Sequence, residues 1–249
     1  MAPLPTRGHN MDRLRKGGLM RGVLRMLRRV ALVLLAAVAL TCVAVAWRGY
    51  ELYRDAVSAR PVEETVEAIR SQPGYVSLDE LPQTYLDAVV AVEDHRFWGH
   101  PGVDVIAIGR AAAHDVMTLS LEQGGSTITQ QLAKNLFLTQ DKDLARKAAE
   151  VFLALDIEGR YEKREILELY VNTAYFGRGC YGIGEAARAI LGKEPSEMTP
   201  DECTLMAGIP NAPSALSADA GAAERRRRVV VGQMEKYEYD VSALSADSG

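Results

Sequence analysis

The feature that most constrains this chain is an uncharged run of eighteen residues near its N-terminus, VALVLLAAVALTCVAVAW at residues 30–47. At a rise of about 1.5 Å per residue, a helix of that length just crosses the hydrocarbon core of a bilayer. The sequence therefore predicts a single transmembrane helix. The run also fits a cleaved signal peptide, because Ala44-Val45-Ala46 resembles a small-residue cleavage site. The basic region before it is long for a signal peptide, which favours an uncleaved anchor.

Charge is distributed unevenly along the chain. Residues 1–47 hold eight basic residues and one acidic residue, whereas the whole chain has a net charge of −4. Arginines ahead of an apolar helix predict a cytoplasmic N-terminus and an exported body under the positive-inside rule. A basic arm before an acidic body indicates membrane orientation more than nucleic-acid binding, so we expect no nucleic-acid partner.

The remainder of the 249 residues has the composition of one principal domain with an appendage, at 48% apolar and 25% charged residues overall. Apolar residues recur at three- and four-residue spacing between helix-capping residues, which predicts an all-α fold. We expect helix starts at Pro82 and Asp104 and a capping box at 199–202. We divide the chain into a basic arm at 1–29, an apolar helix at 30–47, a polar stalk at 48–74, a globular domain at 75–216 and a helical tail at 217–249.

Three cysteines are too few for a disulfide scaffold. Cys180 and Cys203 could pair, but no metal-ligand or redox spacing accompanies either, so we favour two unpaired and partly buried thiols.

The first segment with a chemical signature is EDHRFWGHPGVD at residues 93–104, where two carboxylates follow an apolar helix. Negative charge at a helix C-terminus opposes the macrodipole, and apolar neighbours raise the pKa of a carboxylate, as general acid-base chemistry often requires. Glu93 and Asp94 are therefore candidates, although an acidic pair in a loop is more often a surface feature. His95 and His100 have no third ligand at a metal-site spacing.

The second segment is GGSTITQQLAKN at residues 124–135, where two glycines precede Ser126 and Thr127. Either hydroxyl can cap the helix that follows, and Thr127, Gln131 and Lys134 share one face of it. A glycine-rich turn into a helix N-terminus is suited to an anion or a sugar. An ordinary capped amphipathic helix is the alternative.

The third segment is DLARKAAEVFLALDIEGR at residues 143–160, which reads as one helix ended by Gly159. Its apolar spacing predicts one core-facing stripe: Leu144, Ala148, Val151 and Leu155. Arg146, Lys147 and Glu150 would then lie on the opposite side. They form either a surface ion pair of about 0.3–0.5 kcal/mol or an acid held among cations beside a phosphorylated ligand.

Together the three segments resemble the first three motifs of glycosyltransferase family 51, found in bifunctional penicillin-binding proteins and in monofunctional peptidoglycan glycosyltransferases. Residues 164–193 and 199–216 resemble the remaining motifs, so the resemblance covers about residues 75–216. Five motifs in the same order and spacing form a specific signature. No Ser-x-x-Lys follows and the length leaves no room for a transpeptidase domain, so the monofunctional type is the closer match. The arginines at 225–228 lie outside the motifs, and a solvated helix face is the favoured interpretation of them.

The resemblance implies an all-α, lysozyme-like glycosyltransferase domain on the outer face of a bacterial cytoplasmic membrane. Carried over residue by residue, it places the catalytic base at Glu93 and a second acidic role at Glu150. It assigns substrate binding to residues of several motifs: Asp94, Phe97, His100, Ser126, Thr127, Gln131, Lys134, Asn135, Arg146, Lys147 and Asn172. Glu150 either orients the cations or helps to hold a divalent ion, Mg²⁺ or Mn²⁺, on the substrate pyrophosphate.

The implied reaction polymerises lipid II into β-1,4-linked glycan with inversion and release of undecaprenyl pyrophosphate. The expected partners are lipid II, the growing glycan chain, membrane lipid along a small lobe at 101–123, and other proteins of cell-wall synthesis. Two other classes stay open at this point: a lytic enzyme that cleaves glycan, and a catalytically idle membrane scaffold.

Overall fold

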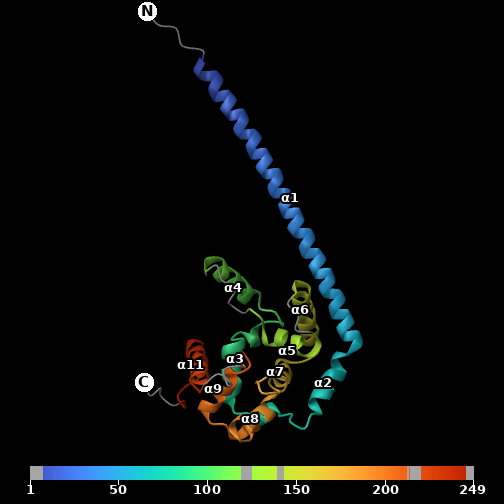
Figure 1. Cartoon of the computed structure of the whole chain (residues 1–249), viewed down its shortest axis with the longest axis vertical. Coiled ribbons are helices and arrows are strands. Elements are labelled where there is room, and N and C mark those ends of the chain that lie inside the picture. Colours follow the sequence, from blue (N-terminus) through green and yellow to red (C-terminus); the bar gives the residue numbers. More distant parts are fainter. Residues whose placement is uncertain (1–7, 119–124, 139–142, 212, 214–219, 245–249) are drawn as a thin grey trace, which may run out of the picture. The chain divides into compact units, whose positions relative to one another are not determined.

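The computed structural model describes residues 8–118, 125–138, 143–211, 213 and 220–244, and these residues are mainly α-helical (Figure 1). Within the described ranges the single β feature is an isolated bridge between Tyr175 and Tyr181. The prediction of an all-α fold is therefore confirmed.

The N-terminal unit contains the predicted apolar helix. Helix α1 (Gly8–Ala59) is continuous over 52 residues, and its stretch from Leu24 to Ala59 is long and apolar enough to cross a membrane. The most apolar window of that stretch has a mean hydropathy of 2.7 and is 0% buried. Apolar side chains that stay wholly exposed are costly in water, so these properties fit a membrane anchor. The compact body begins at Gly49.

Helix α2 (Val62–Arg70) lies within the range that we expected to be a polar stalk. Its apolar residues Val62, Val66 and Ile69 are nevertheless buried in the main hydrophobic cluster. Arg70 also forms an ion pair of 2.8 Å with Glu165. The second half of the expected stalk therefore packs as part of the globular body.

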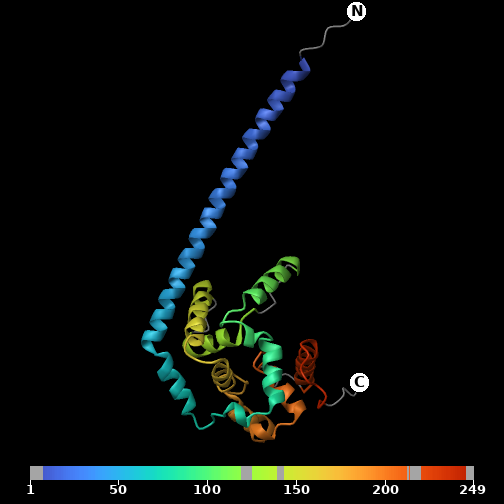
Figure 2. The same cartoon turned by 180° about the vertical axis from the view of Figure 1, so that it is seen from behind.

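Two groups of helices build the body around this cluster. Helices α3 (Gln83–Glu93), α9 (Pro200–Gly208) and α11 (Ala220–Lys236) pack against one another, and they lie together in both views (Figures 1 and 2). The second group has α5 (Ile128–Phe137) in contact with both α6 (Leu144–Glu158) and α7 (Lys163–Val171). Helix α8 (Ile183–Leu191) contacts the short 3₁₀ helix η3 (Pro195–Glu197).

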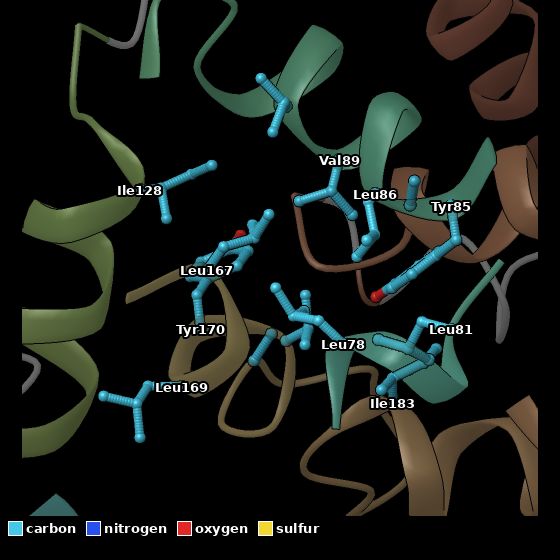
Figure 3. Packing of buried hydrophobic residues seen from close by; sticks show 14 of the residues in the cluster. Leu78, Leu81, Tyr85, Leu86, Val89, Ile128, Leu167, Leu169, Tyr170 and Ile183 are labelled. Atoms are coloured by element: carbon cyan, nitrogen blue, oxygen red, sulfur yellow. The ribbon is translucent and has the colours of Figure 1, made fainter. Parts of the chain in front are cut away.

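The core between the two groups is made of aliphatic and aromatic side chains. Figure 3 shows Val89 and Leu86 of α3 opposite Leu167 and Tyr170 of α7, with Ile128 of α5 beside them. All of these are at most 5% exposed. Removal of this apolar surface from water is the main favourable term that holds α3, α5 and α7 in place.

Helix termini follow the expected caps. Helix α3 begins directly after Pro82. Asp104 accepts hydrogen bonds from the backbone nitrogens of Ile106 and Ala107, at 2.9 and 3.0 Å, and so caps α4 (Val105–Thr118). Thr199 and its capping box begin α9. All three cysteines are free thiols, with Cys180 and Cys203 buried, which confirms the unpaired alternative.

Helix α6 buries a different face from the one that we predicted. Leu144 and Leu155 are 71% and 46% exposed, so the expected stripe does not face the core. The buried residues are Ala145, Ala149, Glu150, Leu153, Ala154 and Ile157. Helix α6 is apolar around much of its circumference, so spacing alone does not select a face. Small alanines allow close approach of neighbouring backbone, and this packing turns Glu150 inward.

We expect Gly184→Ala to destabilise the body. A Cβ at Gly184 of α8 would overlap the carbonyl oxygen of Gly74 and come within 2.8 Å of Val76 Cγ2. Overpacking of this kind costs about 1–3 kcal/mol, and the Tm falls by roughly 2–4 °C per kcal/mol in a domain of this size. Thermal unfolding followed by circular dichroism measures the change.

The matched control is Gly232→Ala in α11, because no described atom lies within 4 Å of the Cβ position there apart from the chain neighbours and the adjacent backbone of the same helix. Alanine is the better helix former by about 1 kcal/mol, so this variant should keep or raise the Tm. Equal Tm values for the two variants would contradict the close contact at Gly184.

Candidate active site

Glu93 is the last residue of α3, and its carboxylate lies at a cavity of about 310 Å³. We call this the base cavity. The chain segments that line it are the end of α3 and the turn after it, the start of α4, the turn before α5, and one side of α11. Segments distant in the sequence thus converge on the residue that the first motif singles out.

The two oxygens of the Glu93 carboxylate have different environments. Oε2 accepts a hydrogen bond of 2.9 Å from Gln131 Nε2, and Gln131 Oε1 accepts one of 3.3 Å from the Tyr170 hydroxyl. Oε1 is buried and has no hydrogen-bond partner among the described residues. One oxygen therefore fixes the orientation of the carboxylate, and the other is available to accept a proton.

Burial raises the pKa of Glu93 above its ordinary value. The Gln131 hydrogen bond and the positive charges of Arg226 and Lys134 oppose that rise, while the neighbouring Asp94 charge adds to it. Lys134 lies on α5, one turn beyond Gln131. A carboxylate with a raised pKa that is still held by nearby cations has the properties of a general base.

Asp94 ties the first motif to the second. Its Oδ2 accepts hydrogen bonds from His100 Nε2 at 2.9 Å and from the backbone nitrogen of Ile128 at 3.1 Å. Ile128 is the first residue of α5, so the carboxylate also interacts favourably with the positive end of that helix. Phe97 is fully buried, with Lys163 Nζ 4.3 Å from its ring centroid. Asp94, with His100 bound to it, thus holds the Glu93 turn against α5, and Phe97 packs beside His100 in the segment that follows.

Hydroxyl groups join the second motif to its neighbours. Thr127 caps α5 by accepting from the backbone nitrogen of Gln130 at 3.1 Å, and its Oγ1 donates to the carbonyl oxygen of Gly102 at 2.6 Å. Ser126 Oγ accepts a hydrogen bond of 2.6 Å from Lys147 Nζ. Both residues line the base cavity, so the third motif reaches the cavity wall through Lys147.

Glu150 forms the centre of a buried ion cluster on α6. Its side chain is 2% exposed, Oε1 accepts from Arg146, and Oε2 is 2.5 Å from Lys147 Nζ. The alternative of a surface ion pair is wrong, because packing turned this face of α6 inward. The cluster carries one negative and two positive charges, so it leaves net positive charge beside Ser126.

The geometry at Glu150 does not fit a divalent ion held by the protein. Both carboxylate oxygens are already engaged by cations. The residues that the structure describes contain no group of three or more His, Cys, Asp or Glu side chains that could hold a metal. A metal at Glu150 would have to displace Arg146 or Lys147.

Three of the expected substrate-binding residues, Asp94, Ser126 and Thr127, line the base cavity, and Gln131 and Lys147 are hydrogen-bonded to residues that line it. The other expected residues do not line it, Asn135 and Asn172 among them. Asn172 is 4% exposed and uses its amide internally: Oδ1 accepts from the backbone nitrogen of Val76 at 2.9 Å, and Nδ2 donates to two carbonyl oxygens. Asn135 is exposed near the end of α5 and lines a different pocket. The geometry gives Asn172 a structural role in joining α7 to residue 76.

Sequence reasoning missed several residues of the site, among them Tyr170 and Arg226. Tyr170 supports Gln131, but in the sequence it is one more apolar position of a helix. Arg226 lines the base cavity, although a run of four arginines reads as a solvated face. No local pattern separates Arg226 from its neighbours, because only packing of α11 on α3 and α9 decides which arginine turns inward.

We expect Glu150→Gln to lower stability far more than Asp156→Asn on the same helix. Glu150→Gln removes the buried acid that pairs with Arg146 and Lys147, and breaking a buried pair costs about 3–5 kcal/mol. Asp156 pairs at 2.8 Å with Arg160, which is 37% exposed, so its loss costs about 0–1 kcal/mol. Urea unfolding of both variants measures the difference, and equal losses would contradict a buried cluster.

Comparison with known proteins agrees with this geometry. A family model described as transglycosylase matches residues 60–235. A putative transglycosylase of Cupriavidus necator is 41% identical over 192 residues, which is 74% of this chain and 83% of that protein. Penicillin-binding proteins 1A of Aquifex aeolicus and Escherichia coli are 49% and 45% identical over 56% and 64% of this chain, which spans 19% of each. The chain therefore belongs to the transglycosylase family and is a glycosyltransferase.

Proposed function

We propose that this protein polymerises lipid II into β-1,4-linked glycan at a membrane surface. The observation that carries the proposal is the Glu93 carboxylate at the base cavity, which is oriented by Gln131 and whose Oε1 has no hydrogen-bond partner among the described residues. Lys134 of α5 contributes positive charge at this carboxylate, and Lys147 of α6 is hydrogen-bonded to Ser126 of the cavity wall, so a diphosphate bound there would meet positive charge. The family membership supports the reaction class.

In the proposed reaction Glu93 Oε1 accepts the proton of the GlcNAc 4-hydroxyl of the acceptor lipid II. The hydroxyl oxygen attacks the anomeric carbon of the MurNAc at the reducing end of the growing chain. The bond from that carbon to undecaprenyl pyrophosphate breaks, and its electrons leave with the pyrophosphate. An α-linked diphosphate becomes a β-glycoside, so one base is enough and no covalent enzyme intermediate forms.

Negative charge grows on the departing pyrophosphate in this step. Lys134, Arg146 and Lys147 are the residues that we assign to stabilise it. Glu150 holds Arg146 and Lys147 in fixed orientation, so the donors need little reorganisation when the charge develops. These cations supply the stabilisation that a divalent ion would otherwise give, so the proposed mechanism requires no protein-held metal.

Membrane attachment fits the lipid substrates. Helix α1 is the proposed anchor, and the arginines before residue 30 orient the body to the outer face of a bacterial cytoplasmic membrane. Helix α4 exposes Val105, Ile106 and Ile108 at 74%, 53% and 44%. Such an exposed apolar patch suits contact with lipid. Met117 and Leu119, two apolar residues of the lobe expected at 101–123, lie outside the side chains that the structure describes.

The direct test is polymerisation of purified lipid II in detergent, with products separated on a gel. Wild-type protein should form polymer, and Glu93→Gln should reduce the rate by at least about 10²-fold, because general-base catalysis contributes 10²–10⁴-fold. Glu64→Gln, an exposed glutamate of α2, is the charge-matched control and should behave as wild type.

The same assay separates the other two classes. Degradation of added polymeric glycan would identify a lytic enzyme. Absence of any product from a folded wild-type preparation would favour a scaffold. Polymer made equally by Glu93→Gln would contradict the assignment of the base.

We expect the polymerisation rate to fall on the acidic side at a higher pH than an ordinary carboxylate would give. The base must be ionised, so activity is lost as the pH falls through the pKa of Glu93. Burial raises that pKa above the ordinary value of about 4.3. Initial rates measured across the acidic range check this, and a rate that stays flat down to about pH 4 contradicts it.

A further inference from the structure

The four consecutive arginines of α11 have different environments. Arg225 and Arg228 are exposed. Arg227 forms ion pairs of 3.1 and 2.8 Å with Asp201 and Glu224. Arg226 is half-buried and is the one arginine of the four that lines the base cavity. The positive charge of Arg226 therefore acts on the Glu93 carboxylate, because both residues line the same cavity.

The Arg226 side chain is held in place by the end of α9. Its Nε donates a hydrogen bond of 2.9 Å to the carbonyl oxygen of Gly208. A Cβ at Gly208 would lie 2.9 Å from Arg226 Cγ, so the glycine permits this close approach. The Nη2 group is buried and has no hydrogen-bond partner among the described residues. Two residues that line the base cavity thus carry groups without a partner in the described part of the chain, a donor on Arg226 and an acceptor on Glu93.

We propose that Arg226 is a positioning residue of the active site, whose fixed and partly buried charge keeps the Glu93 carboxylate ionised and ready to take the acceptor's proton. This inference rests on the proposed polymerisation. A direct hydrogen bond between the two groups would occupy Oε1 and weaken it as a base. A cation that acts through the cavity stabilises the ionised form and leaves that oxygen open.

The other charged and titratable groups that the structure describes around Glu93 do not supply the positive charge that Arg226 supplies. Lys134 adds positive charge from α5. Asp94 is hydrogen-bonded to His100, and Asp104 lies 3.4 Å from Arg96 Nε. The remaining groups that line the cavity or surround the carboxylate are the exposed cations Arg110 and Lys236, the half-buried His95 and Tyr237, and the buried hydroxyls of Tyr85 and Tyr170.

Compared with these groups, Arg226 is the partly buried cation on the α11 side of Glu93. Arg110 and Lys236 are exposed, so solvent screens them more strongly. Tyr85 and Tyr170 are neutral, because burial keeps the pKa of each hydroxyl far above neutral pH. His95 stacks on Tyr237 at 4.0 Å, and burial lowers its pKa, so it adds little positive charge at neutral pH.

The test measures the pH dependence of polymerisation by the full-length protein in which Arg226 has been replaced. Arg226→Met and Arg226→Gln remove the charge with side chains of different shape, and Arg226→Lys retains it. Arg228→Gln, which removes an exposed charge of the same helix, is the matched control. Tm values verify that each variant is folded.

In both neutral variants we expect the acid-side fall of the polymerisation rate, the acidic limb of the pH–rate profile, to move to a pH about one unit higher. The reason is that a nearby charge shifts a carboxylate pKa by 1–3 units. The lost rate should return as the pH is raised, Arg226→Lys should keep most of the wild-type profile, and Arg228→Gln should overlay it. An unmoved limb with a lower kcat, or a raised KM alone, would overturn the proposal and indicate a structural or substrate-binding role.

A second readout separates this inference from the proposed function. Carboxyl carbons of glutamate can be labelled with ¹³C, and the Glu93 signal is the one that Glu93→Gln lacks. Its titration by NMR requires no turnover. A higher pKa of Glu93 in Arg226→Met than in wild type supports the proposal even if no polymer forms, and identical titrations overturn it even if polymer does form.

Discussion

The buried carboxylate of Asp94 is the interaction on which the site depends. It accepts from His100 and from the first backbone nitrogen of α5, and so joins the turn after α3 to a helix that begins more than thirty residues later. The preceding residue, Glu93, then meets Gln131 one turn into α5. Because an unsatisfied buried carboxylate is costly, loss of either contact would release the turn that carries Glu93, the proposed base. The chemistry of Glu93 is thus positioned by its neighbour in the chain.

Around this junction, positive charge is placed in two ways. Lys147 and Arg146 are bound to Glu150, which fixes their orientation but leaves net positive charge for the proposed diphosphate. Arg226 is held through the carbonyl oxygen of Gly208, and among the residues that the structure describes no acid forms an ion pair with it. The first arrangement suits a group that must bind a product anion. The second suits a group that must stabilise an ionised base without bonding to it.

Local signals in the sequence predicted much of the fold, and long-range packing decided the rest. Caps such as Thr127 and Asp104 act on their own helices, so their chemistry can be read directly from neighbouring residues. The buried face of α6 could not be read in this way, because alanines and leucines alternate around the helix and only contact with other helices selects between them. For the same reason, the sequence pattern was compatible with a surface ion pair at Glu150 and favoured a solvated helix face at Arg226. The assignment of Glu93 as the base came from the family resemblance. Without it, a carboxylate at the end of a helix would more often be interpreted as a surface residue.

The measurement that most directly tests the central claim is the configuration of the new glycosidic bond made by the purified protein. One base at the base cavity, with the pyrophosphate leaving on the far side of the sugar, requires inversion. NMR of the polymer formed from α-linked lipid II should therefore show only β-1,4 linkages between the units. An α linkage would require a covalent intermediate on a second carboxylate, and it would contradict the account of Glu93 as the single base.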